Sequence, residues 1–67
     1  MDITHRIAVN IRKYRLAKNL SQEMLAGMSG LHPNYISLVE RGQRQITVVS
    51  LEKIANALNL NLIKLIE

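Results

Sequence analysis

The 67-residue chain has no cysteine, one proline, three glycines and only two aromatic side chains, both tyrosines. Disulfides are therefore excluded. The only two histidines, His5 and His32, lie too far apart in sequence to predict a metal site. A domain of this size buries only about 60% of its unfolded surface, so tight helix packing or self-association must supply the remaining stability. We expect neither a metal nor a cofactor.

Long apolar runs are also missing, which excludes a membrane span, and the first ten residues lack the apolar core of a signal peptide. Hydrophobic residues nevertheless make up 48% of the chain, too many for a disordered segment. The absence of cysteine fits a reducing compartment. We expect a soluble protein of the bacterial cytoplasm, or one encoded by a phage, that is associated with the nucleoid and has no membrane partner.

Residues typical of enzymes are scarce. There is no nucleophilic cysteine, and Asp2, the only aspartate, stands near the terminus. Gly27, Gly30 and Gly42 are too scattered to form a phosphate-binding loop. The sequence predicts a protein that is not an enzyme. It also predicts no small-molecule ligand, because no second domain is present to hold one.

The charge balance favours a polyanionic partner, but weakly. Nine Lys/Arg against five Asp/Glu give a net charge of +4. Most of the excess lies in residues 1–20, where five basic residues accompany a single aspartate, whereas residues 21–45 are balanced. We interpret the N-terminal charges as the solvated face of a helix.

Apolar residues recur at helical spacing along almost the whole chain, which predicts an all-α fold of five helices in one domain, residues 1–67. The first helix covers residues 3–19 and ends near Asn19. Four of its residues share one face, namely Ile3, Ile7, Ile11 and Tyr14. A fourth helix, residues 48–59, follows its N-cap Thr47, and its inward residues are Leu51, Ile54, Ala55 and Leu58. A last short helix covers residues 62–67.

The second and third helices are short and closely spaced. Ser21 is a good N-cap for the second helix, Gly30 ends it, and Leu25, Ala26 and Met28 are placed inward. In the third helix His32 is the N-cap, Pro33 occupies the first position, Ile36 and Val39 face inward, and Gly42 ends the helix.

Residues 21–42 therefore form two short helices joined by a turn at residues 29–31, with Gly30 supplying the positive φ that the turn needs. Ala26 is small enough to stand where the helices cross. This is the pattern of a helix-turn-helix, in which the outer face of the second helix is free to enter the major groove of DNA.

The motif resembles the lambda Cro/repressor-like (XRE-like) family, with Gln22, Ala26, Gly30, Ile36 and Val39 at the family's spacing. The segments IRKYRLAKNLSQEMLA, YISLVERG and LEKIANALNL extend the similarity over nearly the whole chain. The resemblance implies a compact five-helix lambda-repressor-like DNA-binding domain. Within the family, residues 18–47 are particularly similar to controller proteins of restriction–modification systems.

The resemblance also implies DNA contacts within residues 32–45 and at the start of the second helix. Ser21 and Gln22 would bind a phosphate. Asn34 would read an adenine edge through a bidentate hydrogen bond. The other residues on or beside the groove-facing side are His32, Pro33, Tyr35, Ser37 and Leu38, and those along the DNA backbone are Arg41, Arg44 and Gln45.

Some of these positions have alternative interpretations. Tyr35 would reach a phosphate through its hydroxyl or would be a half-buried packing residue. Pro33 and Leu38 depart from the polar residues of related phage repressors and offer only apolar contact, for example to a thymine methyl group, so a known base code does not transfer. Leu38 is otherwise an ordinary exposed leucine, and Arg44 either enters a narrowed minor groove or is a solvated loop charge.

The sequence also predicts one salt bridge and one dimer interface. The resemblance pairs Arg15 with Glu40 in a structural salt bridge between the first and third helices. The apolar C-terminal segment predicts a dimer interface, formed by Leu60, Leu62, Ile63 and Ile66.

The resulting prediction is a homodimeric transcriptional regulator that binds a palindromic operator in double-stranded DNA. Activation would require RNA polymerase as a further partner, and repression would not; the sequence leaves this choice open. The alternative is an antitoxin-type module whose apolar C-terminus binds a toxin, with or without DNA.

Overall fold

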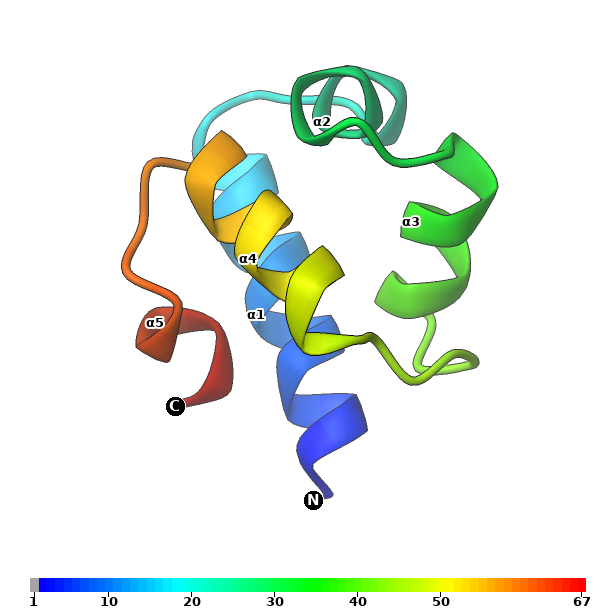
Figure 1. Ribbon diagram of the computed structural model, residues 1–67, viewed down its shortest axis with the longest axis vertical. Helices are drawn as coiled ribbons and strands as arrows, with labels where there is room; N and C mark the ends of the chain where they lie inside the picture. The colour runs from blue at the N-terminus through cyan, green and yellow to red at the C-terminus, as the bar shows by residue number, and fades with distance from the viewer. Residues whose placement is uncertain (1) are drawn as a thin grey trace.

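The computed structural model describes residues 2–67 and contains five helices and no strand within that range. The helices are α1 (Ile3–Ala17), α2 (Gln22–Ser29), α3 (Pro33–Glu40), α4 (Val48–Ala57) and α5 (Ile63–Ile66). In Figure 1, α4 passes in front of the long α1, α2 lies across one end of the pair, and α3 and α5 stand on opposite sides of it. No helix in this part of the chain is long and apolar enough to cross a membrane. The predicted all-α, five-helix fold is confirmed.

The core lies where α1, α2, α3 and α4 converge, and α5 closes it at one side. Every apolar position predicted to face inward on α3 and α4 is buried, and α1 contributes Ile7 and Ile11. The fully buried large side chains are Ile11, Leu25, Ile36, Val39, Ile54, Leu58 and Leu65. The buried core therefore consists of aliphatic side chains, and the rings of Tyr14 and Tyr35 pack against it.

Each of the first four helices begins with a side chain that accepts a backbone N–H of the first turn. The caps are Asp2, Ser21, His32 and Thr47, and the last three confirm the predicted N-caps. The ring nitrogen Nδ1 of His32 accepts the N–H of Asn34 at 3.0 Å, so a histidine fills a role usually taken by serine or aspartate.

Several predicted details of the helices are wrong. The first and fourth helices end at Ala17 and Ala57, before the predicted ends at residues 19 and 59, where Asn19 and Asn59 adopt a left-handed backbone with φ 57° and 56°. The last helix covers Ile63–Ile66 instead of residues 62–67. Met28 was expected to face inward, but it is 56% exposed. Ile3 was placed on one face with Ile7 and Ile11, and it is 51% exposed at the first residue of its helix. The turn between α2 and α3 comprises residues 30–32, one residue later than predicted.

The basic residues of α1 do not form one solvated face, contrary to the expectation. Arg15 is buried, and the Nε of Arg6 donates a hydrogen bond to the carbonyl of Ile66 at 2.9 Å. The side-chain amide of Asn10 donates to the carbonyls of Leu65 and Glu67 at 3.0 and 3.1 Å. Arg6 and Asn10 therefore supply donors to carbonyls at the end of α5, which have no partner within so short a helix. These hydrogen bonds attach α5 to α1.

Candidate DNA-binding surface

A tight turn fixes the angle between α2 and α3. Gly30 ends α2 with φ 71°, a conformation in which a side chain would be strained. The N–H groups of Gly30 and Leu31 both donate to the carbonyl of Ala26, and Ala26 itself is buried. The second helix of the motif therefore leaves the turn in one defined direction.

The outer face of α3 carries three polar side chains and one leucine. Ile36 and Val39 are buried, so the residues on the opposite side of the helix point away from the core. These residues are Asn34, Ser37, Leu38 and Arg41. The Nε of Arg41 donates to the carbonyl of Ser37 at 3.3 Å, which holds the guanidinium along the end of the helix. This face has the size and polarity of a helix that reads base edges in a major groove.

Tyr35 lies beside this face and packs against Arg44 from the following loop. The guanidinium carbon of Arg44 lies 5.4 Å from the centre of the tyrosine ring, within the range of a cation–π contact. Tyr35 is half-buried, and its hydroxyl oxygen is covered and has no hydrogen-bond partner among residues 2–67. In this conformation Tyr35 is the half-buried packing residue of the two alternatives, and its hydroxyl reaches a phosphate only if the ring moves.

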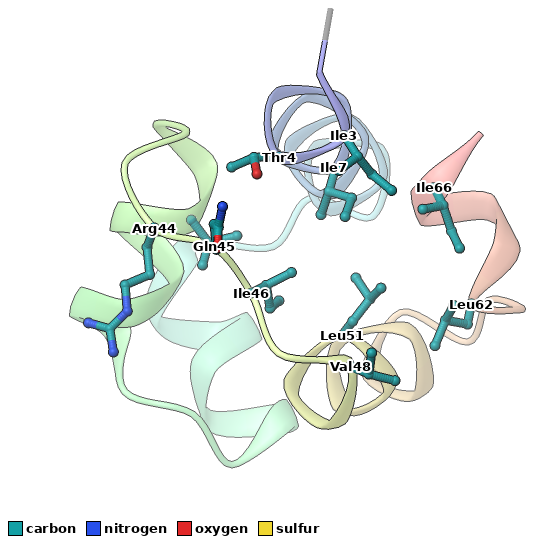
Figure 2. Close-up of a pocket in the computed structure, with 11 residues that line it drawn as sticks. Ile3, Thr4, Ile7, Arg44, Gln45, Ile46, Val48, Leu51, Leu62 and Ile66 are labelled. Carbon is teal, nitrogen blue, oxygen red and sulfur yellow. The ribbon is translucent and has the colours of Figure 1, made fainter.

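The other predicted contact residues are accessible to differing degrees. Those exposed are Ser21, His32, Pro33, Asn34, Arg41, Arg44 and Gln45, whereas Gln22, Ser37 and Leu38 are half-buried. The side chain of Arg44 points away from the apolar groove that its backbone borders (Figure 2). Arg44 is therefore an exposed loop charge whose guanidinium lies over the ring of Tyr35.

A buried ion pair joins α1 to α3. The Nε of Arg15 lies 2.6 Å from Oε2 of Glu40, and the Nη2 of Arg15 lies 2.9 Å from Oε1. The two side chains are 7% and 2% exposed. The third guanidinium nitrogen of Arg15, Nη1, donates to the carbonyl of Leu20 at 2.7 Å. The predicted Arg15–Glu40 salt bridge is confirmed, in the bidentate geometry that favours strong pairing.

Sequence reasoning missed three contacts at this surface. Gln22, at the start of α2, donates from Nε2 to Oε1 of Glu40 at 3.2 Å. Arg12 approaches the same oxygen at 3.9 Å. The third contact is the stack of Arg44 on Tyr35. Each joins residues from separate elements, so no local spacing along the chain could have revealed it.

The comparisons with known proteins agree with this geometry. A family model described as helix-turn-helix matches residues 11–65, more than half of the chain. The chain belongs to the helix-turn-helix family. The match includes α2, α3 and the turn between them, and the fold class, the motif and the outward face of α3 are those of a DNA-binding regulator of this type.

Individual helix-turn-helix proteins are similar over nearly the full chain. Control protein C.SmaI of Serratia marcescens is 50% identical over 66 residues, which are 98% of this chain and 79% of that protein. The crystal structure of the restriction-modification controller protein C.AhdI from Aeromonas hydrophila superposes with a TM-score of 0.90 at 42% identity, covering 92% of this chain and 94% of that one. The crystal structure of a hypothetical transcription factor from Neisseria superposes with a TM-score of 0.95 at 38% identity, and the match covers 98% of this chain and 76% of that one.

Proposed function

We propose that this protein is a homodimeric, sequence-specific transcriptional regulator that controls the genes of a restriction–modification system. The similarity to two controller proteins over almost the entire chain carries this proposal. Asn34 and its neighbours on the outer face of α3 read base edges, and Arg41, Arg44 and Gln45 contact the DNA backbone. A bacterial cell, with its DNA in the cytoplasm, is the setting in which such a regulator works.

A second copy of the chain is the proposed partner of an apolar surface beside α5. Residues of α1, α4, α5 and the loop before α4 surround a groove of about 400 Å³, and they include Ile3, Val48, Leu62 and Ile66 (Figure 2). Val48 and Ile63 are 75% and 55% exposed. Leu60, Leu62 and Ile66 are half-buried against the core and present only their remaining surface. An exposed apolar surface that surrounds a groove is typical of an association site.

The test of operator binding is a selection of bound duplexes from a random pool at near-physiological salt. The expected result is enrichment of an imperfect palindrome whose half-sites are one helical turn apart, about 34 Å. Asn34→Ala should weaken binding to that duplex about tenfold and relax the preference at one base pair, because a bidentate amide–adenine contact contributes roughly 1–3 kcal/mol of discrimination. Asn56→Ala, an exposed asparagine of α4, is the matched control.

Two outcomes would contradict the proposal. Enrichment of no sequence, with binding that declines smoothly as salt rises, means attraction to the backbone alone. Equal losses for Asn34→Ala and Asn56→Ala mean that α3 does not read the bases. Either result would favour the antitoxin-type alternative, in which the apolar surface binds another protein.

A further inference from the structure

Three side chains from two helices meet at the carboxylate of Glu40, which belongs to a third helix. Oε1 of Glu40, at the end of α3, accepts a hydrogen bond from Gln22 of α2 at 3.2 Å and lies 3.9 Å from Nη1 of Arg12 of α1. The same carboxylate is already bound by the buried Arg15. The amide of Gln22 and the guanidinium of Arg12 are therefore held on the solvent side of a carboxylate that is itself only 2% exposed.

The charges around Glu40 leave Arg12 available to another anion. Arg15 and Glu40 form a short bidentate pair, which neutralises the carboxylate. Arg12 touches it only at 3.9 Å with one terminal nitrogen, and its side chain is 59% exposed. Two guanidinium groups thus share a single carboxylate, and the positive charge of Arg12 remains uncompensated within this group.

The chemistry of the two exposed groups fits a phosphate. A guanidinium offers several N–H donors in a planar fork that matches phosphate oxygens, and only one amide N–H of Gln22 is used by Glu40, so the second is available. Gln22 also opens α2, where the first backbone N–H groups have no acceptor within the helix. In a helix-turn-helix complex the anions beside the motif are the phosphates that border the major groove.

We propose that Arg12 and Gln22 bind one DNA backbone phosphate together, and that Glu40 is the positioning residue that aligns them. This inference rests on the proposed DNA-binding function and adds to it a contact from α1, outside the helix-turn-helix itself. Glu40 cannot touch the phosphate, because both are negative and its oxygens are occupied. Its role is to hold the Gln22 amide and the Arg12 guanidinium in register, while Arg15 holds Glu40.

Salt dependence measures the contact made by Arg12. A residue that binds one phosphate contributes about 0.9 to the slope of log affinity against log salt. Arg12→Gln should lower that slope by this amount, so that between 50 and 200 mM salt the variant loses roughly 3.5-fold less affinity than the parent protein. The reduction should be equal on operator and unrelated DNA, since a phosphate carries no sequence information.

Matched variants separate a local contact from a change in net charge. Lys53→Gln removes one positive charge from an exposed position on α4 and should leave the slope nearly unchanged. Arg12→Lys keeps the charge and should retain most of the slope. If Arg12→Gln and Lys53→Gln give the same slope, the Arg12 contact does not exist.

Neutral methylphosphonates placed one at a time in the selected duplex identify the phosphate. One substitution should weaken binding by the parent protein and have no further effect on Arg12→Gln or on Gln22→Ala. If the two variants are insensitive to different phosphates, or remain sensitive to all of them, a shared clamp is overturned. Failure of the parent protein to bind any duplex even at 50 mM salt would overturn the proposed function instead.

The positioning role of Glu40 needs a variant that folds without the ion pair. Replacing both partners, Arg15→Met with Glu40→Met, leaves no unpaired buried charge, and folding is checked by circular dichroism. In that background Gln22→Ala should cost at least threefold less affinity than in the parent protein, because the amide is no longer held. An equal cost in both backgrounds would exclude positioning by Glu40, and this comparison is independent of the Arg12 measurements.

Discussion

At the scale of single residues, the carboxylate of Glu40 connects three helices of this molecule. It joins α1 to α3 through Arg15 and reaches Gln22 at the start of α2. The pairing with Arg15 was predicted from the family resemblance, and the bond to Gln22 was not. The reason is physical: the first depends on two positions that the resemblance supplies, whereas the second depends on the angle between helices, which only tertiary packing defines.

Glu40→Ala should be strongly destabilising, because it leaves the guanidinium of Arg15 buried without its counter-ion. Breaking a buried pair in this way costs about 3–5 kcal/mol. For a domain of this size the melting temperature should fall by about 12 °C or more, measured by circular dichroism. Glu52→Ala, at an exposed position of α4, is the control and should change it little. An unchanged melting temperature for Glu40→Ala would show that the pair has no structural role.

At the scale of elements, the starts of the helices and the glycine of the turn were the most predictable features. Three N-caps, the proline at the first position of α3 and the glycine that ends α2 all stand where the chain chemistry placed them. The errors lie at the C-terminal ends of helices and in the exposure of Met28. Asn19 follows the end of α1 with a positive φ. Asparagine tolerates this conformation but does not always adopt it, so the sequence alone could not predict the end of the helix.

Replacing Gly27, within α2, and Gly30, its C-cap, by alanine should change the free energy of unfolding in opposite directions. Gly27 is helical, and a methyl group added there meets nothing within 4 Å, so Gly27→Ala should stabilise the fold by about 0.5–1 kcal/mol. Gly30 has φ 71°, so Gly30→Ala should destabilise it by about 1–2 kcal/mol although space is available. Urea unfolding of both variants measures the difference. Shifts of equal sign would refute the assignment of Gly30 as the conformational stop of the motif.

At the scale of the whole molecule, the apolar C-terminal surface was only partly predictable. Four residues of a short helix define no clear periodicity, and the orientation of α5 is fixed by distant donors, Arg6 and Asn10. Leu65 is consequently buried, whereas Ile63 faces solvent. Val48, exposed at the start of α4, enlarges this surface but was assigned to no interface, because the fold alone brings it to the same side as Leu62 and Ile66.

The arrangement of the helices suits a dimer formed through this surface. The molecule measures 27 × 23 × 21 Å, and α3 lies on the opposite side of α1 and α4 from α5 (Figure 1). Two copies joined at their α5 sides would hold their recognition helices at the outer ends of the pair. That placement allows the separation of about 34 Å between successive major grooves on one face of DNA.

Ile63→Glu should therefore convert a dimer into monomers, because association would bury the new carboxylate in an apolar contact. Met28→Glu, on α2, is the matched control: its parent side chain is 56% exposed, against 55% for Ile63. Sedimentation of the parent protein and of Met28→Glu should give a dimer, and sedimentation of Ile63→Glu a monomer.

The melting temperature of the parent protein should also rise with concentration, and that of Ile63→Glu should not. A parent protein that sediments as a monomer at every concentration would exclude the dimer, and a dimeric Ile63→Glu would place the interface on another surface.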